Sequence, residues 1–386
     1  MASSDEAVDT WLCEHGSAPV RYRTLRDILH RPADDPELAA AARAVAEYQP
    51  ALDVAAAQDR DGTWAGRLHT ADSRLGIHLT TEIQLPRLSE YGWGPESAAV
   101  RRTAVFLRRL LPRQGSASAD YRDLAPYMRG TRRRRYIVNF ARAIAAGLLA
   151  HAGYSDDPAV IATARDLLDA TYRFVTGPAA AAPVRGDPPV VVEAAFDHQL
   201  GYPAIPDLYL LQLFAYCPAL SQGDGRQRIK AVVDYVLGPA YDALDERIGY
   251  VALEDHPFVK GWKIVLPPPH ELTRTGRWGY GLIVLEMFAR LTPLVRHKRL
   301  AAYLDWLQQW RRPDGLYDAP AAAFSAAASG HVATRVRLSP DWRRAEHRIA
   351  DITFRVRLIE ALAANDPGLR YLNTDLYRQA AGRASS

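Results

Sequence analysis

The chain has 386 residues, and its 48 Lys and Arg residues nearly balance its 44 Asp and Glu residues, for a net charge of +4. So small an excess does not indicate nucleic-acid binding, and the presence of only two cysteines, Cys13 and Cys217, excludes a disulfide framework. The sequence has no apolar run of about 18 residues, and its first residues lack the basic and apolar parts of a signal peptide. We therefore expect a cytoplasmic protein with no integral membrane segment and no nucleic-acid partner.

A helix–break–helix pattern recurs along the chain, as in helical-repeat proteins. In each copy an apolar-periodic helix is followed by a polar break, such as Tyr91–Gly92 or Gly153–Tyr154, and then by a second helix. The clear copies are 79–111, 137–175, 208–237 and 280–310, and weaker copies are 20–58 and 350–366. This repeat predicts an all-α fold of about six helical hairpins.

The two helices of each copy differ in polarity. The first is the more apolar, whereas the second carries more Arg, Asp and Lys on one face, which is typical of an inner ring of helices inside an outer ring. We therefore expect a single α/α toroid domain over 1–386, with flexible tails at 1–10 and 380–386. An open solenoid is the alternative, because a repeat period does not show whether the ends of the array meet.

Long segments separate the hairpins and contain many Trp, Tyr, His and Arg residues. Loops of this length in a compact helical protein are usually either functional or disordered. In a toroid the mouth of the pocket lies where such loops lead into the inner helices, so candidate site residues are expected there. The segments are 60–78, 112–135, 176–206, 239–277 and 313–348.

Two side chains of the third segment and one that directly follows it are the expected catalytic residues. Asp197 and His198 are adjacent, and a carboxylate beside an imidazole can tune proton transfer near neutral pH. Asp207 follows where the segment leads into the next apolar helix. A structural hydrogen-bonding role is the alternative, since neighbouring side chains in a loop often point apart.

The expected substrate-binding residues are mostly cationic or aromatic. Arginines of the run at 129–135 could hold a phosphate, diphosphate or carboxylate, or could form a solvated charged surface. Aromatic residues of the later segments could stabilise a carbocation or stack on a sugar, or could simply pack in the core. The set consists of Arg132, Arg135, Tyr136, Asn139, Tyr202, Trp262, Lys263, Trp278 and Tyr280.

The sequence gives no sign of a cofactor or a metal. It has no P-loop, no dinucleotide-binding fingerprint after a strand, and no cluster of Cys and His. His69, Asp72 and His78 have donor types that suit a metal, but their spacing is irregular, so a surface histidine is the more common interpretation. We therefore expect no obligatory cofactor.

A turn after the first hairpin carries a family resemblance. The residues Gln58-Asp59-Arg60-Asp61-Gly62-Thr63-Trp64 resemble the QW motif of squalene-hopene cyclases and their relatives, and a looser copy runs from Gln309 to Tyr317. The glycine of such a turn allows positive φ, the glutamine can satisfy helix-end carbonyls, and the aromatic ring covers the turn. Together with residues 11–29, this motif resembles short bacterial squalene-cyclase-like or prenyltransferase-like proteins, which implies an α/α toroid with a central cavity.

The catalytic motifs of those families are not found in the sequence. It has neither the DxDD motif of cyclases that protonate an alkene nor the DDxxD motif that binds magnesium and diphosphate. Asp156–Asp157 lacks the third aspartate, and Cys217 beside Pro218 is badly placed for the zinc site of a protein prenyltransferase. Any chemistry must therefore use other residues.

Three functions agree with these observations. The first is a terpene cyclase-like isomerase or lyase that acts on an isoprenoid or other apolar small molecule by acid/base-assisted cyclisation or rearrangement. The second is an α/α-toroid enzyme for a sugar or another polar, anionic ligand. The third is a non-catalytic toroid that binds a small molecule or a partner. The sequence does not indicate an oligomeric state.

Overall fold

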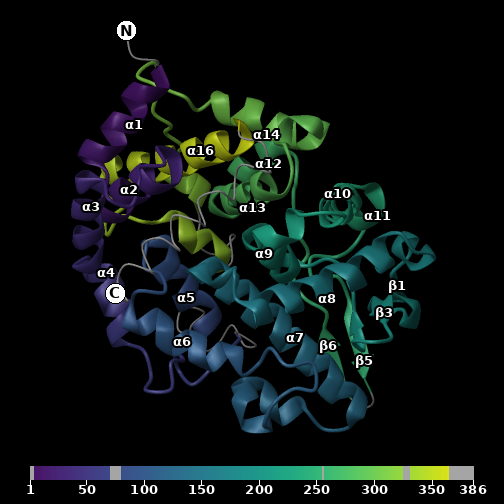
Figure 1. Ribbon diagram of the computed structural model, residues 1–386. Helices are drawn as coiled ribbons and strands as arrows, with labels where there is room; N and C mark the ends of the chain where they lie inside the picture. The colour runs from purple at the N-terminus through teal and green to yellow at the C-terminus, as the bar shows by residue number, and fades with distance from the viewer. Residues whose placement is uncertain (1–3, 70–79, 254–255, 325–330, 365–386) are drawn as a thin grey trace. The chain divides into compact units, whose positions relative to one another are not determined.

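The computed structural model describes residues 4–69, 80–253, 256–324 and 331–364. This part of the chain is mostly helical, which confirms the all-α class, and none of its helices is long and apolar enough to cross a membrane. The chain divides into two compact units. Unit 1 comprises Met1–Gln58, Pro86–Ser97 and Leu266–Ser386, and unit 2 comprises Asp59–Leu85 and Ala98–Val265 (Figure 1).

Unit 1 is built around two long helices, α13 (Trp278–Leu291) and α16 (Ala345–Ala364), which pack against each other. Every residue of α13 except Tyr280 and Arg290 is buried, as expected for a helix that is apolar on all sides. The other elements of this unit are α1 (Ser4–His15), α2 (Ala18–Arg23), η1 (Thr24–Ile28), α3 (Pro36–Ala46), α4 (Gln49–Ala56), α12 (Pro269–Arg274), η8 (Leu294–Arg296), α14 (Lys298–Gln308), η9 (Ala321–Phe324) and η10 (His331–Val336). Helix α5 (Thr81–Glu90) begins in unit 2 and ends in unit 1.

Buried ion pairs connect the helices of unit 1. The guanidinium of Arg355 donates to Glu90 at 2.6 Å and also pairs with Glu286, and the Arg355 and Glu286 side chains are fully buried. Arg23 pairs with Glu90, and Arg290 donates to Glu286 at 2.7 Å. Burial would raise the pKa of Glu286, but Arg355 and Arg290 hold it below its ordinary value. Helices α2, α5, α13 and α16 are therefore joined by charged side chains that are almost completely buried.

Removing Arg355 should destabilise unit 1 strongly. In an Arg355→Met variant the two glutamates stay buried with one cation fewer, and breaking a buried pair in this way typically costs about 3–5 kcal/mol. The free energy of unfolding, measured by urea titration with tryptophan fluorescence, should fall by that amount. Arg274→Met is the control, because Arg274 pairs with Glu271 on the surface and should change stability little. Equal effects of the two substitutions would contradict the role given to the buried charges.

Two turns, one in each unit, have the same local structure. Gly62 and Gly315 both have positive φ, +87° and +86°, and the backbone hydrogen bonds that close the two turns match. The aromatic residue two positions later, Trp64 or Tyr317, is buried in each case. The backbone N–H of each aromatic residue donates to a threonine hydroxyl of a helix, at Thr81 and Thr353. The looser QW-like copy, Gln309–Tyr317, thus has the same local structure as the first copy, Gln58–Trp64.

Unit 2 has α7 (Thr131–Leu149) and α9 (Leu208–Tyr216) at its centre, packed side by side. Helix α7 is buried from Tyr136 on and α9 is buried up to Ala215, whereas α8 (Pro158–Val175) and α10 (Gly225–Val236) bury one face, in agreement with the polarity difference in the sequence. The shorter elements are α6 (Ala98–Arg108), η3 (Ser118–Tyr127), η4 (Ala150–Tyr154), η5 (Pro178–Ala181), η6 (Glu193–Ala195), η7 (Pro218–Ser221) and α11 (Pro239–Asp242).

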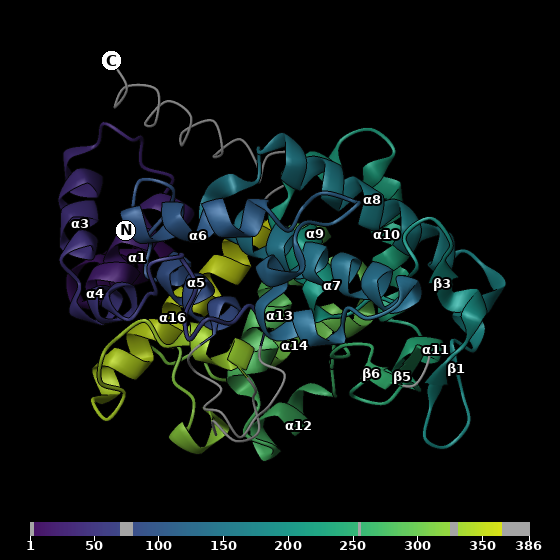
Figure 2. The same cartoon turned by 90° about the horizontal axis from the view of Figure 1, so that it is seen from below.

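Short strands occupy parts of the segments that the sequence leaves between helices. One sheet has the order β1 (Val184–Arg185), β2 (Val190–Val191), β5 (Tyr250–Leu253) and β6 (His256–Val259), in which only the β2–β5 pair is parallel. A separate hairpin pairs β3 (Phe196–Asp197) with β4 (Tyr202–Pro203). Figures 1 and 2 show these strands grouped at one side of unit 2, next to α7 and α8. They are too short for an alternating pattern to indicate them.

Candidate functional site

Asp197 and His198, the expected acid/base pair, lie in the hairpin of β3 and β4. The Asp197 carboxylate accepts the backbone N–H groups of Gln199 and Leu200, each at 3.0 Å, and the guanidinium of Arg173 at 2.6 Å. The His198 side chain is exposed, and no hydrogen bond joins it to Asp197 in the described part of the chain. These contacts are those of a residue that fixes a turn.

Asp207, the third expected catalytic residue, belongs to a buried ion pair. Its Oδ1 atom caps α9 by accepting the N–H of Leu210 at 3.0 Å, and its Oδ2 atom lies 2.5 Å from Nζ of Lys260. Tyr202 donates to the same oxygen at 3.3 Å, and the side chains of Asp207 and Lys260 are 0% exposed. At Gly261, a Cβ would lie 2.8 Å from Oδ2, so the residue after Lys260 has to be glycine. Asp207 is therefore the counter-charge that allows a lysine to be buried.

Substitution of Asp207 should have an effect that depends on pH. Burial lowers the pKa of Lys260 and Asp207 opposes this effect, so Asp207→Asn should lower the pKa further. Between that lower pKa and the ordinary value of 10.5, the unfolded chain binds more protons than the folded chain, so stability rises with pH. We expect a loss of about 3–5 kcal/mol at neutral pH that shrinks as the pH approaches the ordinary lysine value.

The free energy of unfolding of the full chain, measured by urea titration at several pH values, would report this loss. Asp157→Asn is the matched control, because Asp157 also caps a helix but pairs with Arg108, a half-exposed residue. Asparagine is as good a cap as aspartate, so this control should change stability little at any pH. If the stability lost in D207N were the same at every pH, the loss would not come from the titration of Lys260.

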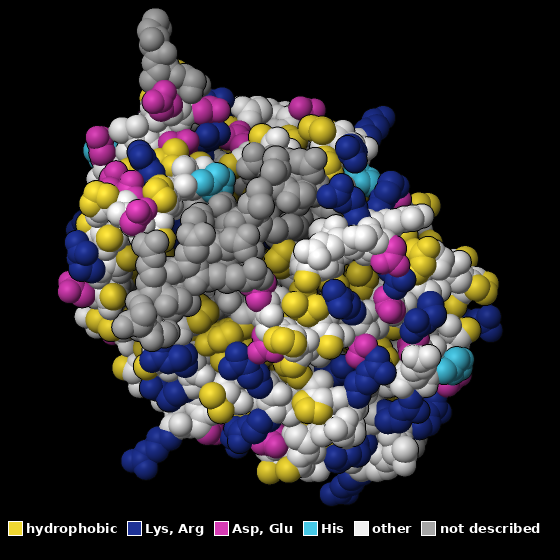
Figure 3. All heavy atoms as spheres, viewed as in Figure 1, with side chains coloured by type: hydrophobic (Ala, Val, Ile, Leu, Met, Phe, Trp, Pro, Cys, Tyr) yellow, Lys and Arg dark blue, Asp and Glu magenta, His cyan; other side chains and the backbone are white. Residues whose placement is uncertain are grey.

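The expected binding residues at the start of α7 are engaged in local contacts. Arg132 pairs with Glu193 at 2.7 Å, and Arg135 donates to two backbone carbonyls of the β3–β4 hairpin. Tyr136 donates to the carbonyl of Val259, and Asn139 donates to that of Leu200 at 2.7 Å. Figure 3 shows Lys and Arg side chains with Asp and Glu side chains between them on the surface that is seen in this view. These residues hold the strands against α7.

The other expected binding residues lie in different units. Trp262 is 42% exposed in unit 2, and Lys263 donates to two backbone carbonyls at 2.6 Å. Trp278 of unit 1 is buried against Trp306, with 4.2 Å between ring centroids. Tyr280 is half-buried on α13. Trp278 therefore contributes to the core of unit 1.

A carboxylate that carries no sequence motif, Asp123 of η3, lies against His69. Its Oδ1 atom accepts the N–H groups of Leu68 at 2.8 Å and His69 at 3.4 Å. The preceding residue, Arg122, has φ +53°, a conformation that is unfavourable for arginine. The guanidinium of Arg122 pairs with Asp61 at 2.5 Å, which helps to hold this strained turn.

Two side-chain atoms of this pair lack hydrogen-bond partners. Oδ2 of Asp123 and Nδ1 of His69 are buried, and neither bonds to any atom in the described part of the chain. A buried polar atom without a partner costs about 1–3 kcal/mol, so such atoms are rare and call for an explanation. Burial raises the pKa of Asp123, although the N–H of Leu68 and the imidazole of His69 oppose this. A carboxyl shifted in this direction beside an imidazole is suited to acid/base chemistry.

Aromatic rings extend from His69 along α7 and α9. The His69 ring lies 5.2 Å from that of Phe140, which lies 5.7 Å from Tyr209 and 6.1 Å from Tyr136. Tyr136 in turn lies 5.7 Å from Tyr202. We call Phe140, Tyr209, Tyr136 and Tyr202 the aromatic row. The negative faces of such rings attract positive charge.

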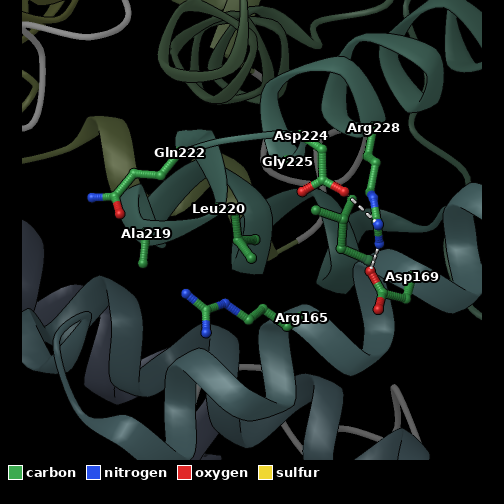
Figure 4. A pocket seen from close by; sticks show the side chains of 9 residues that line it. Arg165, Asp169, Ala219, Leu220, Gln222, Asp224, Gly225 and Arg228 are labelled. Atoms are coloured by element: carbon green, nitrogen blue, oxygen red, sulfur yellow. Dashed lines mark hydrogen bonds and ion pairs between the residues drawn. The ribbon is translucent and has the colours of Figure 1, made fainter.

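A pocket of about 270 Å³ lies elsewhere in unit 2, between α8, η7 and α10. Arg228 pairs there with Asp169 and Asp224, whereas the guanidinium of Arg165 has no ion pair or hydrogen bond within the described residues. Figure 4 shows Arg165 extended beneath Leu220, apart from the charged side chains of Arg228, Asp169 and Asp224. The lining consists of Arg165, Leu168, Asp169, Ala219, Leu220, Gln222, Asp224, Gly225 and Arg228.

The sequence indicates this site only in part. His69 lies at an expected pocket mouth and Tyr136 and Tyr202 are expected binding residues, but nothing marks Asp123. Among the described residues no cluster of three or more His, Cys, Asp or Glu side chains could hold a metal, and Asp72 and His78 lie outside those residues.

Protein-family models, curated proteins and solved structures offer no match to this chain.

Proposed function

We propose that the chain is a terpene cyclase-like enzyme that transfers protons to and from an apolar small molecule, with Asp123 as acid and His69 as base. The observation that carries the proposal is that two buried atoms beside the aromatic row, Asp123 Oδ2 and His69 Nδ1, have no hydrogen-bond partner among the described residues. Buried polar atoms of this kind call for an explanation, and proton transfer is the one that we propose.

An α/α toroid is the architecture that we propose for this enzyme. The pairing of a buried helix with a helix that has one polar face, as in α7 with α8 and α9 with α10, supports it. So do the equivalent turns at Gly62 and Gly315, because a repeated turn indicates repeated hairpins. In this architecture the first helix of each pair would line the inner ring.

The proposed reaction is an isomerisation in which protons and electrons balance. Asp123, as the carboxylic acid, donates its proton to one carbon of a substrate double bond and leaves a carbocation. The faces of the aromatic row stabilise the cation. Neutral His69 then removes a proton from the carbon next to the cation, and the C–H electrons form a new double bond. Proton transfer from the imidazolium to the Asp123 carboxylate restores the enzyme.

Deuterium incorporation tests this function without knowledge of the natural substrate. The purified protein is incubated in D2O with geraniol, farnesol or squalene, and the recovered compounds are examined by mass spectrometry. We expect carbon-bound deuterium with the wild type and a rate lower by about 10²–10⁴-fold with Asp123→Asn, since the amide cannot act as the acid.

Asp120→Asn is the matched control for that experiment. Asp120 lies in the same short helix, η3, but its carboxylate is partnered by Ser116 at 3.0 Å and Arg109 at 3.6 Å, so we expect wild-type rates. Absence of deuterium from all three compounds, or equal rates for D123N and the wild type, would refute the proposed activity.

A second candidate function is the binding of a small anion in the pocket that contains Arg165. Arg228 of this pocket pairs with two aspartates, whereas Arg165 has no ion pair among the described residues, so Arg165 supplies the positive charge for an anion. This observation favours a polar, anionic ligand, which is the second of the three functions that agree with the sequence.

Calorimetric titration with inorganic phosphate at low salt tests this second function. Arg165→Gln should weaken binding about tenfold, which is the loss of one charge-assisted contact. Arg185→Gln, on an exposed strand residue outside the pocket, should bind phosphate as the wild type does. Identical affinities of the wild type and R165Q would exclude the pocket as the anion site.

A further inference from the structure

We propose that the pocket between α8, η7 and α10 binds a free amino acid with an apolar side chain, whose carboxylate pairs with Arg165 and whose ammonium group binds Asp169 and Asp224. This inference rests on the second proposed function, the binding of an anion by Arg165, and names the class of ligand to which the anionic group belongs.

The charged groups that line the pocket cancel one another. They are two arginines, Arg165 and Arg228, and two aspartates, Asp169 and Asp224, so the formal charge of the lining is zero. A simple anion would be attracted by Arg165 but repelled by both carboxylates. A ligand that carries one negative and one positive group matches this lining better, because each of its charges can face the opposite charge.

The charges are also separated within the pocket. Figure 4 shows the Arg165 guanidinium below and to the left of Leu220, whereas the other three charged side chains lie to the right of Leu220. The anionic and cationic groups of one ligand can therefore be bound at different ends of the pocket. Leu168 and Leu220, which also line it, then contact the apolar part of the ligand.

Each aspartate has one oxygen that an ammonium group can use. Arg228 donates to Oδ1 of Asp169 and, at 2.5 Å, to Oδ2 of Asp224, and the other oxygen of each carboxylate has no hydrogen bond to a described residue. Asp224 is the N-cap residue of α10, but its side chain does not cap the helix. Since both carboxylates bind the same guanidinium, they lie close together. A primary ammonium group has three N–H donors and can bind both.

The size and lining of the pocket favour a small primary amine over other cations. Its volume of about 270 Å³ lies below the range of about 300–1,000 Å³ that is typical for drug-sized ligands, so the ligand must be small. None of the residues that line the pocket is aromatic, whereas quaternary ammonium groups are recognised by aromatic rings. An ammonium group with N–H donors is therefore the better match.

Three compounds with the same branched carbon skeleton test the inference. They are leucine, 4-methylpentanoate, which lacks the ammonium group, and 3-methylbutylamine, which lacks the carboxylate. Each is titrated into the full chain by calorimetry at low salt. We expect leucine to bind at least about tenfold more tightly than the other two, because each of them forms only one of the two charge-assisted contacts.

Two substitutions separate the two contacts. Asp224→Asn should remove most of the preference for leucine over 4-methylpentanoate, and the Asp224 side chain is 74% exposed, so the fold should tolerate this change. Arg165→Gln should remove most of the preference for leucine over 3-methylbutylamine. Asp234→Asn is the matched control, because Asp234 lies on the same helix and pairs with Lys230 at 2.5 Å, outside the pocket. This control should keep both preferences.

Equal affinity of the wild type for leucine and 4-methylpentanoate would overturn the inference, as would the absence of leucine binding. A preference for leucine that D224N retains would also overturn it. These outcomes are separate from a failure of the second proposed function, which is read from phosphate binding. If R165Q weakens phosphate binding but the wild type does not distinguish leucine from 4-methylpentanoate, the pocket binds anions without selecting amino acids.

Discussion

The constraint on which the structure depends is that a charge removed from water must have a partner of opposite charge. In unit 1 the partner of Arg355 comes from α5 on one side and α13 on the other, so a single guanidinium fixes three helices. In unit 2 Lys260 reaches Asp207 across more than fifty residues of sequence, and the pair fixes the start of α9 beside the end of β6. Each contact is made once, between specific atoms, so it selects one arrangement of the helices where apolar packing alone would allow several.

The same constraint explains why polar residues of the long segments resemble catalytic residues in the sequence. Asp197 lies beside a histidine, Asp207 follows aromatic residues, and Arg132 belongs to an arginine run, but each has a structural partner in Arg173, Lys260 or Glu193. A carboxylate that caps a turn and a carboxylate that transfers a proton use the same residue types. They differ in whether all of their hydrogen-bonding atoms are occupied, and that difference is visible only in three dimensions.

Much of the fold could be predicted because it depends on local pattern. The four clear helix pairs, the polarity difference between α7 and α8, and the turn at Gly62 all follow from periodicity or from a residue with special backbone freedom. The strands of two to four residues could not be predicted, since so short a segment has no period. Asp123 could not be predicted either, because its contact with His69 spans more than fifty residues and depends on the positive φ of Arg122.

Buried side-chain atoms without a hydrogen-bond partner among the described residues also occur elsewhere, as at Thr24 Oγ1 and Trp310 Nε1, but Asp123 and His69 contribute two such atoms from residues that are in contact. Folding gains nothing from burying Oδ2 and Nδ1 without partners among the described residues, and a leucine and a phenylalanine of similar volume would avoid the cost of about 1–3 kcal/mol for each atom. The neighbouring turn adds further strain at Arg122. A sequence that keeps both features beside a row of aromatic rings is explained most simply if the pair transfers protons, as we propose.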